Sequence, residues 1–137
     1  MNRIRILLVD DEEPVLRACS RVLHEIPGAE IVLESVSQRA AEMLSSEKFD
    51  LLISDMRMPG VDGVELLRIA HRHHPQLPVI LITGFPTPDV VADGREVGAA
   101  ACVMKPVVPD ELITTVRSVL SRDRATKSAE GDVLSVQ

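Results

Sequence analysis

The chain has 137 residues, which suits one domain, and its core must be aliphatic because 45% of the residues are hydrophobic but only 1% aromatic. The formal net charge of −6 argues against nucleic-acid binding, which needs clustered lysine and arginine side chains. Cys19 and Cys102 form no Cys-x-x-Cys pair, and no apolar run approaches the length of a membrane span or a secretory signal. We therefore expect a cytoplasmic protein with reduced cysteines and no membrane association.

Five short runs rich in valine, isoleucine and leucine are predicted as β-strands. They cover residues 4–9, 30–34, 50–54, 78–83 and 101–104. Most of these runs lack a polar alternation, which is typical of strands that are covered on both faces. Because a helical pattern follows each strand, the series predicts an α/β domain with a parallel sheet and right-handed crossovers.

The segments between the strands are amphipathic and are predicted as helices over residues 13–26, 37–46, 62–73, 88–97 and 109–122. Pro27 and Gly28 end the first of these helices, and Pro109 suits the first turn of the last one. From about residue 123 the apolar pattern stops and small polar residues dominate. We therefore predict a domain over 1–122 and a linker or disordered tail over 123–137.

Polar residues stand directly after four of the five predicted strands. They are Asp10 and Asp11 after the first strand, Asp55 after the third, Thr83 at the end of the fourth and Lys105 after the fifth. Ligand sites of parallel α/β sheets lie at the carboxyl ends of the strands, near the switch in strand order. These five residues share one crevice if the order is 2-1-3-4-5, but the pattern alone does not give that order.

Three carboxylates in one crevice call for a cation, and an all-oxygen ligand set favours Mg²⁺ or Ca²⁺ over zinc. Mg²⁺ is preferred because it keeps waters and accepts phosphate oxygens as ligands. An aspartate can also act as a nucleophile and form an aspartyl phosphate. Asp55 is best placed for that role, because it stands alone at a central strand while Asp10 and Asp11 form a pair.

Four stretches carry a resemblance to a known family: "ILLVDDE", "LLISDMRMPGVDG", "VILITG" and "GAAACVMKP". In this order and spacing the chain resembles the receiver domain of two-component response regulators over nearly all of residues 3–122. The resemblance implies a flavodoxin-like, doubly wound, five-stranded parallel sheet of order 2-1-3-4-5 with five helices.

The resemblance also implies a role for each residue of the cluster. Asp55 would accept a phosphoryl group from the phosphohistidine of a sensor kinase or phosphotransfer protein. Asp11 would bind Mg²⁺ directly, Asp10 largely through water, and Asp55 and the backbone carbonyl of Arg57 would complete the protein ligands. The phosphoryl oxygens would be contacted by Thr83 and Lys105.

Phosphorylation would switch the conformation of the domain and so control an output partner or domain. The receiver would promote only its own phosphorylation and dephosphorylation, and would not be an enzyme acting on an external substrate. Many family members dimerise through the fourth helix, fifth strand and fifth helix, so the outer edge of helix 109–122 is a candidate homodimer surface. Glu12 and Glu13 are expected to face solvent at the positive end of the first helix.

The chain departs from the family at two positions. Cys102 stands where the family usually has a tyrosine or phenylalanine that changes rotamer on activation, and Val107 stands where a phenylalanine is common. These replacements argue against the usual aromatic switch. The hypothesis is that Thr83 and the 84–90 loop carry the change, with Phe85 as the moving ring.

Other functions fit the residues less well. A pseudo-receiver that binds partners without phosphorylation is disfavoured because the acids and the lysine are all present. An Mg²⁺-dependent phosphatase with an aspartate nucleophile would want a second acid two residues later, where this chain has Arg57. A flavin-binding module would want a phosphate loop after the first strand, where four acids stand. The "HRHH" run at 71–74 favours a helix end over a metal site.

Overall fold

The computed structural model describes residues 3–84 and 88–136, with side chains described up to residue 122. Phe85, the ring proposed to move on activation, lies outside the described residues. Strands and helices alternate in the order β1 (Ile4–Val9), α1 (Glu13–Leu23), β2 (Ala29–Glu34), α2 (Ser37–Ser46), β3 (Leu51–Asp55), α3 (Gly63–His73), β4 (Val79–Thr83), α4 (Pro88–Glu96), β5 (Ala101–Met104) and α5 (Pro109–Val136). In the described part of the chain, no helix is both long and apolar enough to cross a bilayer.

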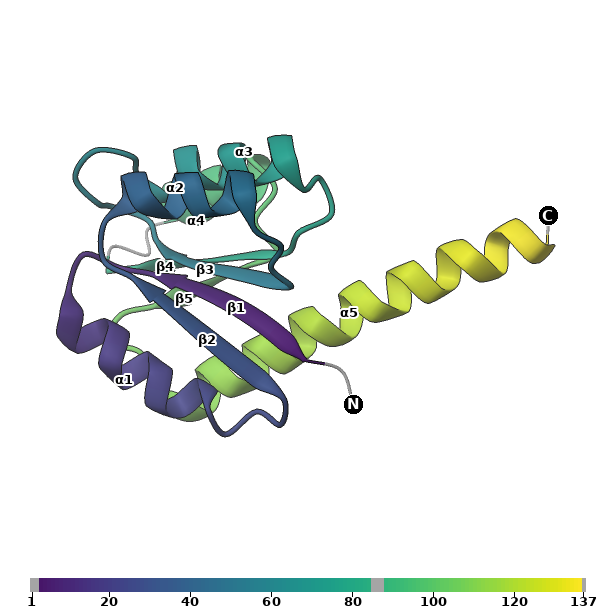
Figure 1. The fold of residues 1–137 in the computed structure, drawn as a ribbon, viewed down its shortest axis with the longest axis horizontal. Coiled ribbons are helices and arrows are strands. Elements are labelled where there is room, and N and C mark those ends of the chain that lie inside the picture. The colour runs from purple at the N-terminus through teal and green to yellow at the C-terminus, as the bar shows by residue number, and fades with distance from the viewer. Residues whose placement is uncertain (1–2, 85–87, 137) are drawn as a thin grey trace.

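The strands form one five-stranded sheet of order β2-β1-β3-β4-β5, and every neighbouring pair is parallel. This confirms the predicted doubly wound α/β fold and the strand order that the resemblance implied. Helices α1 and α5 cover one face of the sheet, and α2, α3 and α4 cover the other (Figure 1). The order places β1 and β3 at the switch point, where the chain first adds strands to the opposite side of β1.

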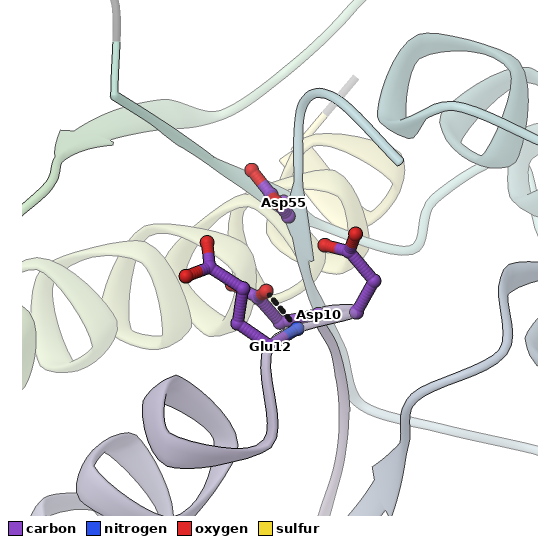
Figure 2. Close-up of side chains that lie close together, drawn as sticks. Asp10, Glu12 and Asp55 are labelled. Carbon is purple, nitrogen blue, oxygen red and sulfur yellow. Dashed lines mark hydrogen bonds between the residues drawn. The ribbon is translucent and has the colours of Figure 1, made fainter. Parts of the chain in front are cut away.

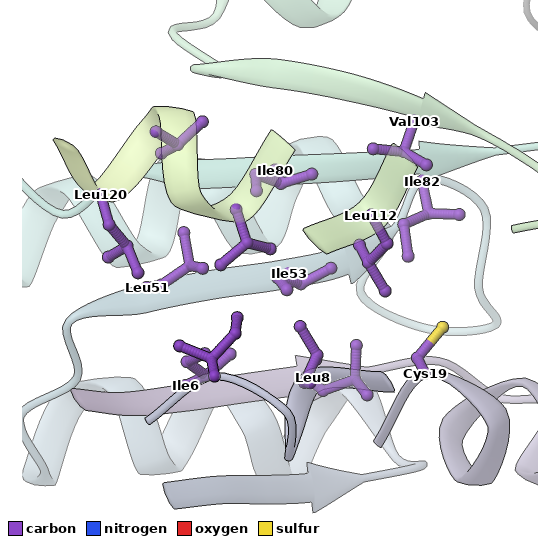
Figure 3. Close-up of a cluster of buried hydrophobic side chains, with 14 of the residues drawn as sticks. Ile6, Leu8, Cys19, Leu51, Ile53, Ile80, Ile82, Val103, Leu112 and Leu120 are labelled. Carbon is purple, nitrogen blue, oxygen red and sulfur yellow. The ribbon is translucent and has the colours of Figure 1, made fainter. Parts of the chain in front are cut away.

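Alternating residues of each central strand feed two separate cores, because successive side chains of a strand point to opposite faces. Ile6 and Leu8 of β1 belong to the core beneath α1 and α5, part of which Figure 3 shows. Leu7 and Val9 belong to the core beneath α2, α3 and α4. Burial on both faces explains why the strand sequences show no polar alternation.

Two helix ends differ from the sequence prediction. Helix α1 ends at Leu23, three residues before the predicted end, and Gly28 then turns with φ of 80°. Helix α5 continues to Val136 instead of ending at residue 122, and its last part projects beyond the sheet (Figure 1). The apolar pattern stops near Leu120 because it reports only the buried part of the helix. The helix itself can continue, since residues 123–130 include good helix formers and no proline. The division into domain and tail stays a prediction.

Candidate functional site

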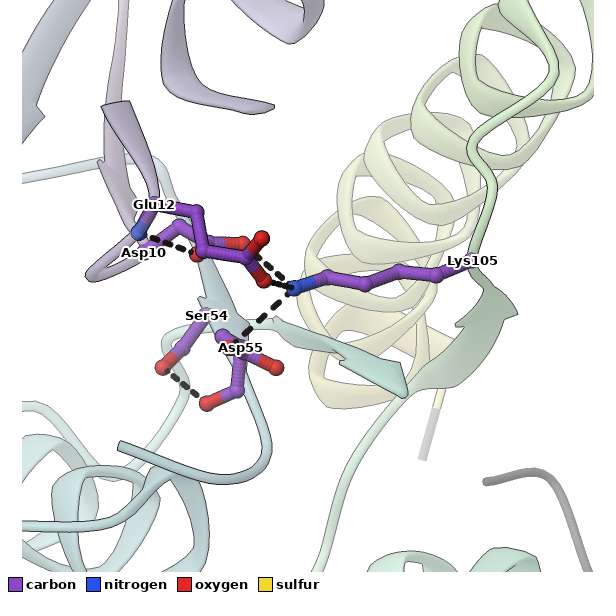
Figure 4. Close-up of polar contacts among 5 residues, drawn as sticks. All are labelled: Asp10, Glu12, Ser54, Asp55 and Lys105. Carbon is purple, nitrogen blue, oxygen red and sulfur yellow. Dashed lines mark hydrogen bonds and ion pairs between the residues drawn. The ribbon is translucent and has the colours of Figure 1, made fainter. Parts of the chain in front are cut away.

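Three strands deliver charged side chains to one edge of the sheet. Asp10 follows β1, Asp55 is the last residue of β3 and Lys105 follows β5. The Lys105 Nζ lies 3.0 Å from Asp10 Oδ2 and 3.2 Å from Asp55 Oδ2, so one ammonium joins both acids (Figure 4). Thr83 ends β4, is 3% exposed and is paired in register with Met104, the residue before Lys105. The carboxyl ends of the strands therefore meet as the sequence predicts.

Glu12 is exposed, as expected, and it also belongs to this cluster. Its Oε1 lies 3.1 Å from Lys105 Nζ, and its backbone amide donates a 2.9 Å hydrogen bond to Asp10 Oδ1. Only its position in the chain, next to two acids at a strand end, could have suggested this. Glu13 is exposed, as expected, and its Oε2 lies 3.2 Å from Nη2 of Arg17.

The acids offer a ligand set for a divalent ion. Asp10, Asp11, Glu12 and Asp55 each place one carboxylate oxygen within 4.8 Å of the others, and Figure 2 shows three of these side chains converging. Asp10 is fully buried, and its Oδ2 receives no aligned hydrogen bond, although the Lys105 ammonium lies 3.0 Å away. A buried carboxylate oxygen without a donor is the group that a hard cation satisfies, so the residues present fit Mg²⁺.

Burial and charge shift the titration of the three central groups. Burial raises the pKa of Asp10. Burial also raises the pKa of Asp55, and the negative charge of Asp10 adds to that rise. Burial alone would lower the pKa of Lys105, but contacts with Asp10, Glu12 and Asp55 outweigh it and raise that pKa above its ordinary value. The lysine therefore stays charged, while burial makes ionisation of the two acids costly, and another cation would relieve that cost.

The start of α3 lies directly against the backbone of the Asp55 loop. The Asp62 carboxylate caps the helix by accepting a 2.9 Å hydrogen bond from the Glu65 amide, and the Gly63 amide donates to the Met56 carbonyl at 3.0 Å. A Cβ at residue 63 would overlap the Asp55 carbonyl oxygen and lie 2.8 Å from Met56 Cα. Glycine at position 63 is thus required for this close approach, which fixes the loop that carries Asp55.

The remaining candidate residues are placed as follows. Arg57 is exposed in the loop after β3, and a backbone hydrogen bond from it acts on the Asp55 carboxylate. Its carbonyl as a metal ligand stays a prediction. Nε2 of His71 lies 2.9 Å from the Leu77 carbonyl oxygen, and Nε2 of His74 lies 2.9 Å from that of Leu44. These contacts engage one ring nitrogen of each histidine, and the helix-end interpretation of the histidine run stays a prediction.

Comparison with known proteins agrees with the fold. The response regulator receiver domain family matches residues 6–117. Response regulator UvrY of Escherichia coli is 33% identical over 122 residues, which cover 88% of this chain and 56% of UvrY. The phosphate regulon transcriptional regulatory protein PhoB of Pseudomonas aeruginosa is 35% identical over 85% of this chain and 52% of PhoB. The chain thus spans about half the length of these two relatives.

A solved CheY-like receiver domain from Methanospirillum hungatei has a TM-score of 0.84 and 28% identity, and covers 91% of this chain and 99% of its own. The receiver domain of an HD domain-containing protein from Pseudomonas fluorescens has a TM-score of 0.82 and 30% identity, and covers 90% of this chain and 99% of its own. The family match, the strand order and the acids around Lys105 agree, and we conclude that this chain belongs to the response regulator receiver domain family.

Proposed function

We propose that Asp55 accepts a phosphoryl group from the phosphohistidine of a sensor histidine kinase or phosphotransfer protein. An Asp55 carboxylate oxygen attacks the phosphorus, the bond between phosphorus and the histidine nitrogen breaks, and its electron pair stays on the imidazole ring. The observation that carries the proposal is the ion pair of 3.2 Å between Lys105 and the buried Asp55. Because the Lys105 ammonium lies beside Asp55, it is close to the phosphoryl oxygens and stabilises their negative charge during transfer.

Thr83 is the second group that would contact the phosphoryl oxygens. It ends the strand next to β3, and its hydroxyl is a hydrogen-bond donor for an oxyanion. Asp10, Asp11, Asp55 and the carbonyl of Arg57 would hold Mg²⁺. The bound ion supplies positive charge that offsets the acids and the incoming phosphoryl group. Lys105 contributes the fixed positive charge that the chain itself provides.

The consequence of phosphorylation is a change of conformation that controls an output domain or partner. The chain promotes its own phosphorylation and dephosphorylation and turns over no external substrate. The surface formed by α4, β5 and α5 is the proposed homodimer contact, and Met104 at 55% exposure is an apolar group on it. We place the protein in the cytoplasm, without direct nucleic-acid or membrane binding by this segment.

Intact-mass analysis after incubation with acetyl phosphate tests the proposal. We expect gain of one phosphoryl group with Mg²⁺ and no gain with a chelator. Asp55→Asn should abolish the gain, whereas Asp50→Asn, the same change at the opposite end of β3, should leave it intact. Asp50 accepts a hydrogen bond from the Arg5 amide and lies away from the cluster, so it is a matched control.

Two outcomes would contradict the proposal. Gain that persists in Asp55→Asn would place the acceptor elsewhere. No gain in the folded wild-type protein under any condition would favour a pseudo-receiver that binds its partner unmodified. The phosphatase alternative predicts continuous release of phosphate from an external monoester, which the same samples can be assayed for. The chain has Arg57 where such an enzyme would want its second acid.

A further inference from the structure

A groove lies between the second half of α3 and the end of α4, two helices that cover the same face of the sheet (Figure 1). Helix α3 packs closely on α2 but makes only slight contact with α4, and a space of about 530 Å³ is left beside it. This α3–α4 groove is lined by Leu67, Arg68, His71 and Arg72 of α3 and by Val97, the residue after α4. Among the described residues, no acidic side chain lines it.

The groove carries positive charge that its surroundings do not neutralise. Arg68 and Arg72 are exposed and stand four positions apart, which places them one turn apart on the same side of α3. In the part of the chain that the structure describes, neither forms an ion pair, whereas Arg5 and Arg17 both do. The sequence explains this, because residues 66–88 include no aspartate or glutamate although the chain has 21 acids. Two like charges at this spacing repel each other, so an acidic ligand would relieve that repulsion.

The base of the groove is apolar, and its position is set by the core. Leu67 is fully buried, and Val97 is half-buried and packs on the same core beneath α2, α3 and α4. The His71 ring is held at one side, since its Nε2 lies 2.9 Å from the Leu77 carbonyl oxygen. Gly98 turns beside this ring with φ of 106°, and a Cβ there would lie 3.3 Å from His71 Cε1. The groove therefore combines a fixed apolar base with a charged rim.

We propose that the α3–α4 groove binds an acidic amphipathic helix of a partner protein. The helix presents two carboxylates one turn apart, which match the spacing of Arg68 and Arg72 and accept paired hydrogen bonds from their guanidinium groups. An apolar side chain between the carboxylates packs on Val97 and on the aliphatic stems of the two arginines. No annotation of the family match or of the phosphorylation site includes these residues, and the groove lies outside that site.

Charge and shape favour this occupant over other anions. Nucleic acids and anionic membranes are extended polyanions, and the net charge of −6 of the chain repels them outside the immediate groove. The apolar base lies below the exposed arginines, so a flat bilayer surface would meet the charges without reaching Val97. A helix can enter the space between two helices and meet both the rim and the base.

The groove is remote from the phosphorylation site along α3. Gly63, the first residue of α3, lies against the Asp55 backbone, whereas Arg72 stands in the last turn. Nine residues separate Gly63 from Arg72, which corresponds to roughly 13 Å along the helix. We therefore expect the partner helix to bind without phosphorylation, and Asp55→Asn should bind it as tightly as wild type.

Fluorescence anisotropy with a labelled synthetic peptide tests the inference. The peptide is helical and carries two glutamates one turn apart with a leucine between them, and a control peptide of equal composition has the glutamates on opposite sides. We expect Arg68→Gln combined with Arg72→Gln to weaken binding at least about tenfold, the effect of losing one charge-assisted hydrogen bond. Arg21→Gln combined with Arg117→Gln removes the same charge from exposed positions of α1 and α5, and should stay within about twofold of wild type.

The outcomes separate this inference from the proposed function. No binding by the folded wild type, equal binding of both peptides, or an equal loss in the two double variants would overturn the inference. Binding to vesicles with anionic phospholipid that requires Arg68 and Arg72, without binding of the peptide, would identify a membrane contact instead and also overturn it. Peptide binding by a wild type that cannot be phosphorylated would support the inference and reject the proposed function alone.

Discussion

Replacing Lys105 tests how the buried acids are balanced. Lys105→Met keeps an unbranched side chain but removes the charge that lies 3.0 Å from Asp10, 3.1 Å from Glu12 and 3.2 Å from Asp55. The Lys105 side chain is only 17% exposed, and Asp10 is fully buried. Without the ammonium, two buried carboxylates face each other with no protein cation between them, so the folded state should lose stability.

The size of the stability loss in Lys105→Met follows from how deeply the acidic partners of Lys105 are buried. Breaking a fully buried ion pair costs roughly 3–5 kcal/mol, whereas an exposed pair contributes about 0–1 kcal/mol. Asp10 and Asp55 belong to the first class and Glu12, 61% exposed, belongs to the second. We expect Lys105→Met to lower the free energy of unfolding by about 2–4 kcal/mol at pH 7 without divalent ions.

The pH dependence of the loss has a definite sign. Burial already raises the pKa of Asp10 and of Asp55, and removal of the ammonium removes a cause that lowers both. Acids whose pKa is higher in the folded state contribute stability when protonated and lose it as the pH rises through that range. The deficit of the variant should therefore shrink on acidification, and Mg²⁺ should stabilise the variant more than wild type.

Urea unfolding followed by far-ultraviolet circular dichroism measures these changes, since the chain has no tryptophan or tyrosine. Arg17→Met is the matched control, because it removes a cation from an exposed pair with Glu13 at 3.2 Å and should cost at most about 0.5 kcal/mol. A Lys105→Met deficit no larger than that of the control, or one that grows on acidification, would refute the reasoning.

Three further predictions concern the metal and the Asp55 loop. Mg²⁺ should raise the thermal midpoint of wild type, and Asp11→Asn should reduce that rise; an equal rise in both proteins would exclude Asp11 as a ligand. Because the pKa values of Asp10 and Asp55 are raised, Mg²⁺ affinity in calorimetric titrations should begin to fall at a higher pH than for exposed aspartates, and the prediction fails if it does not. Gly63→Ala should lower the free energy of unfolding in urea by about 1–3 kcal/mol and slow phosphorylation, whereas an unchanged rate would mean that the Asp55 loop tolerates displacement.

Much of the fold could be predicted from local patterns. The runs around Leu7 and Leu52 lack polar alternation, and the structure buries both residues completely. The end of α5 could not be predicted in the same way. An apolar stripe reports which part of a helix is buried, and the stripe ends near Leu120, while the backbone stays helical to Val136.

The residue types of the site were also evident from the chain, because they stand at strand ends. Asp10, Asp55 and Lys105 are separated by tens of residues, so their meeting depends on strand order, which the residues alone left open and the resemblance supplied. Glu12 was expected to face solvent and is 61% exposed, but its carboxylate also reaches the same ammonium at 3.1 Å. The direction of the Glu12 side chain depends on Lys105, a partner that another strand supplies and that the local sequence does not reveal.

The sequence by itself determined which segments become strands and helices, where the acids and the lysine stand along them, and which residues replace the family's aromatic positions. It did so because periodicity and strand-end position are local properties of a chain. Only the tertiary structure decided that one ammonium joins three acids, that a buried Asp10 oxygen lacks a hydrogen bond, and that the start of α3 at Gly63 lies against the Asp55 backbone. Such contacts join segments far apart in the chain, and their distances are set by how the helices pack on the finished sheet.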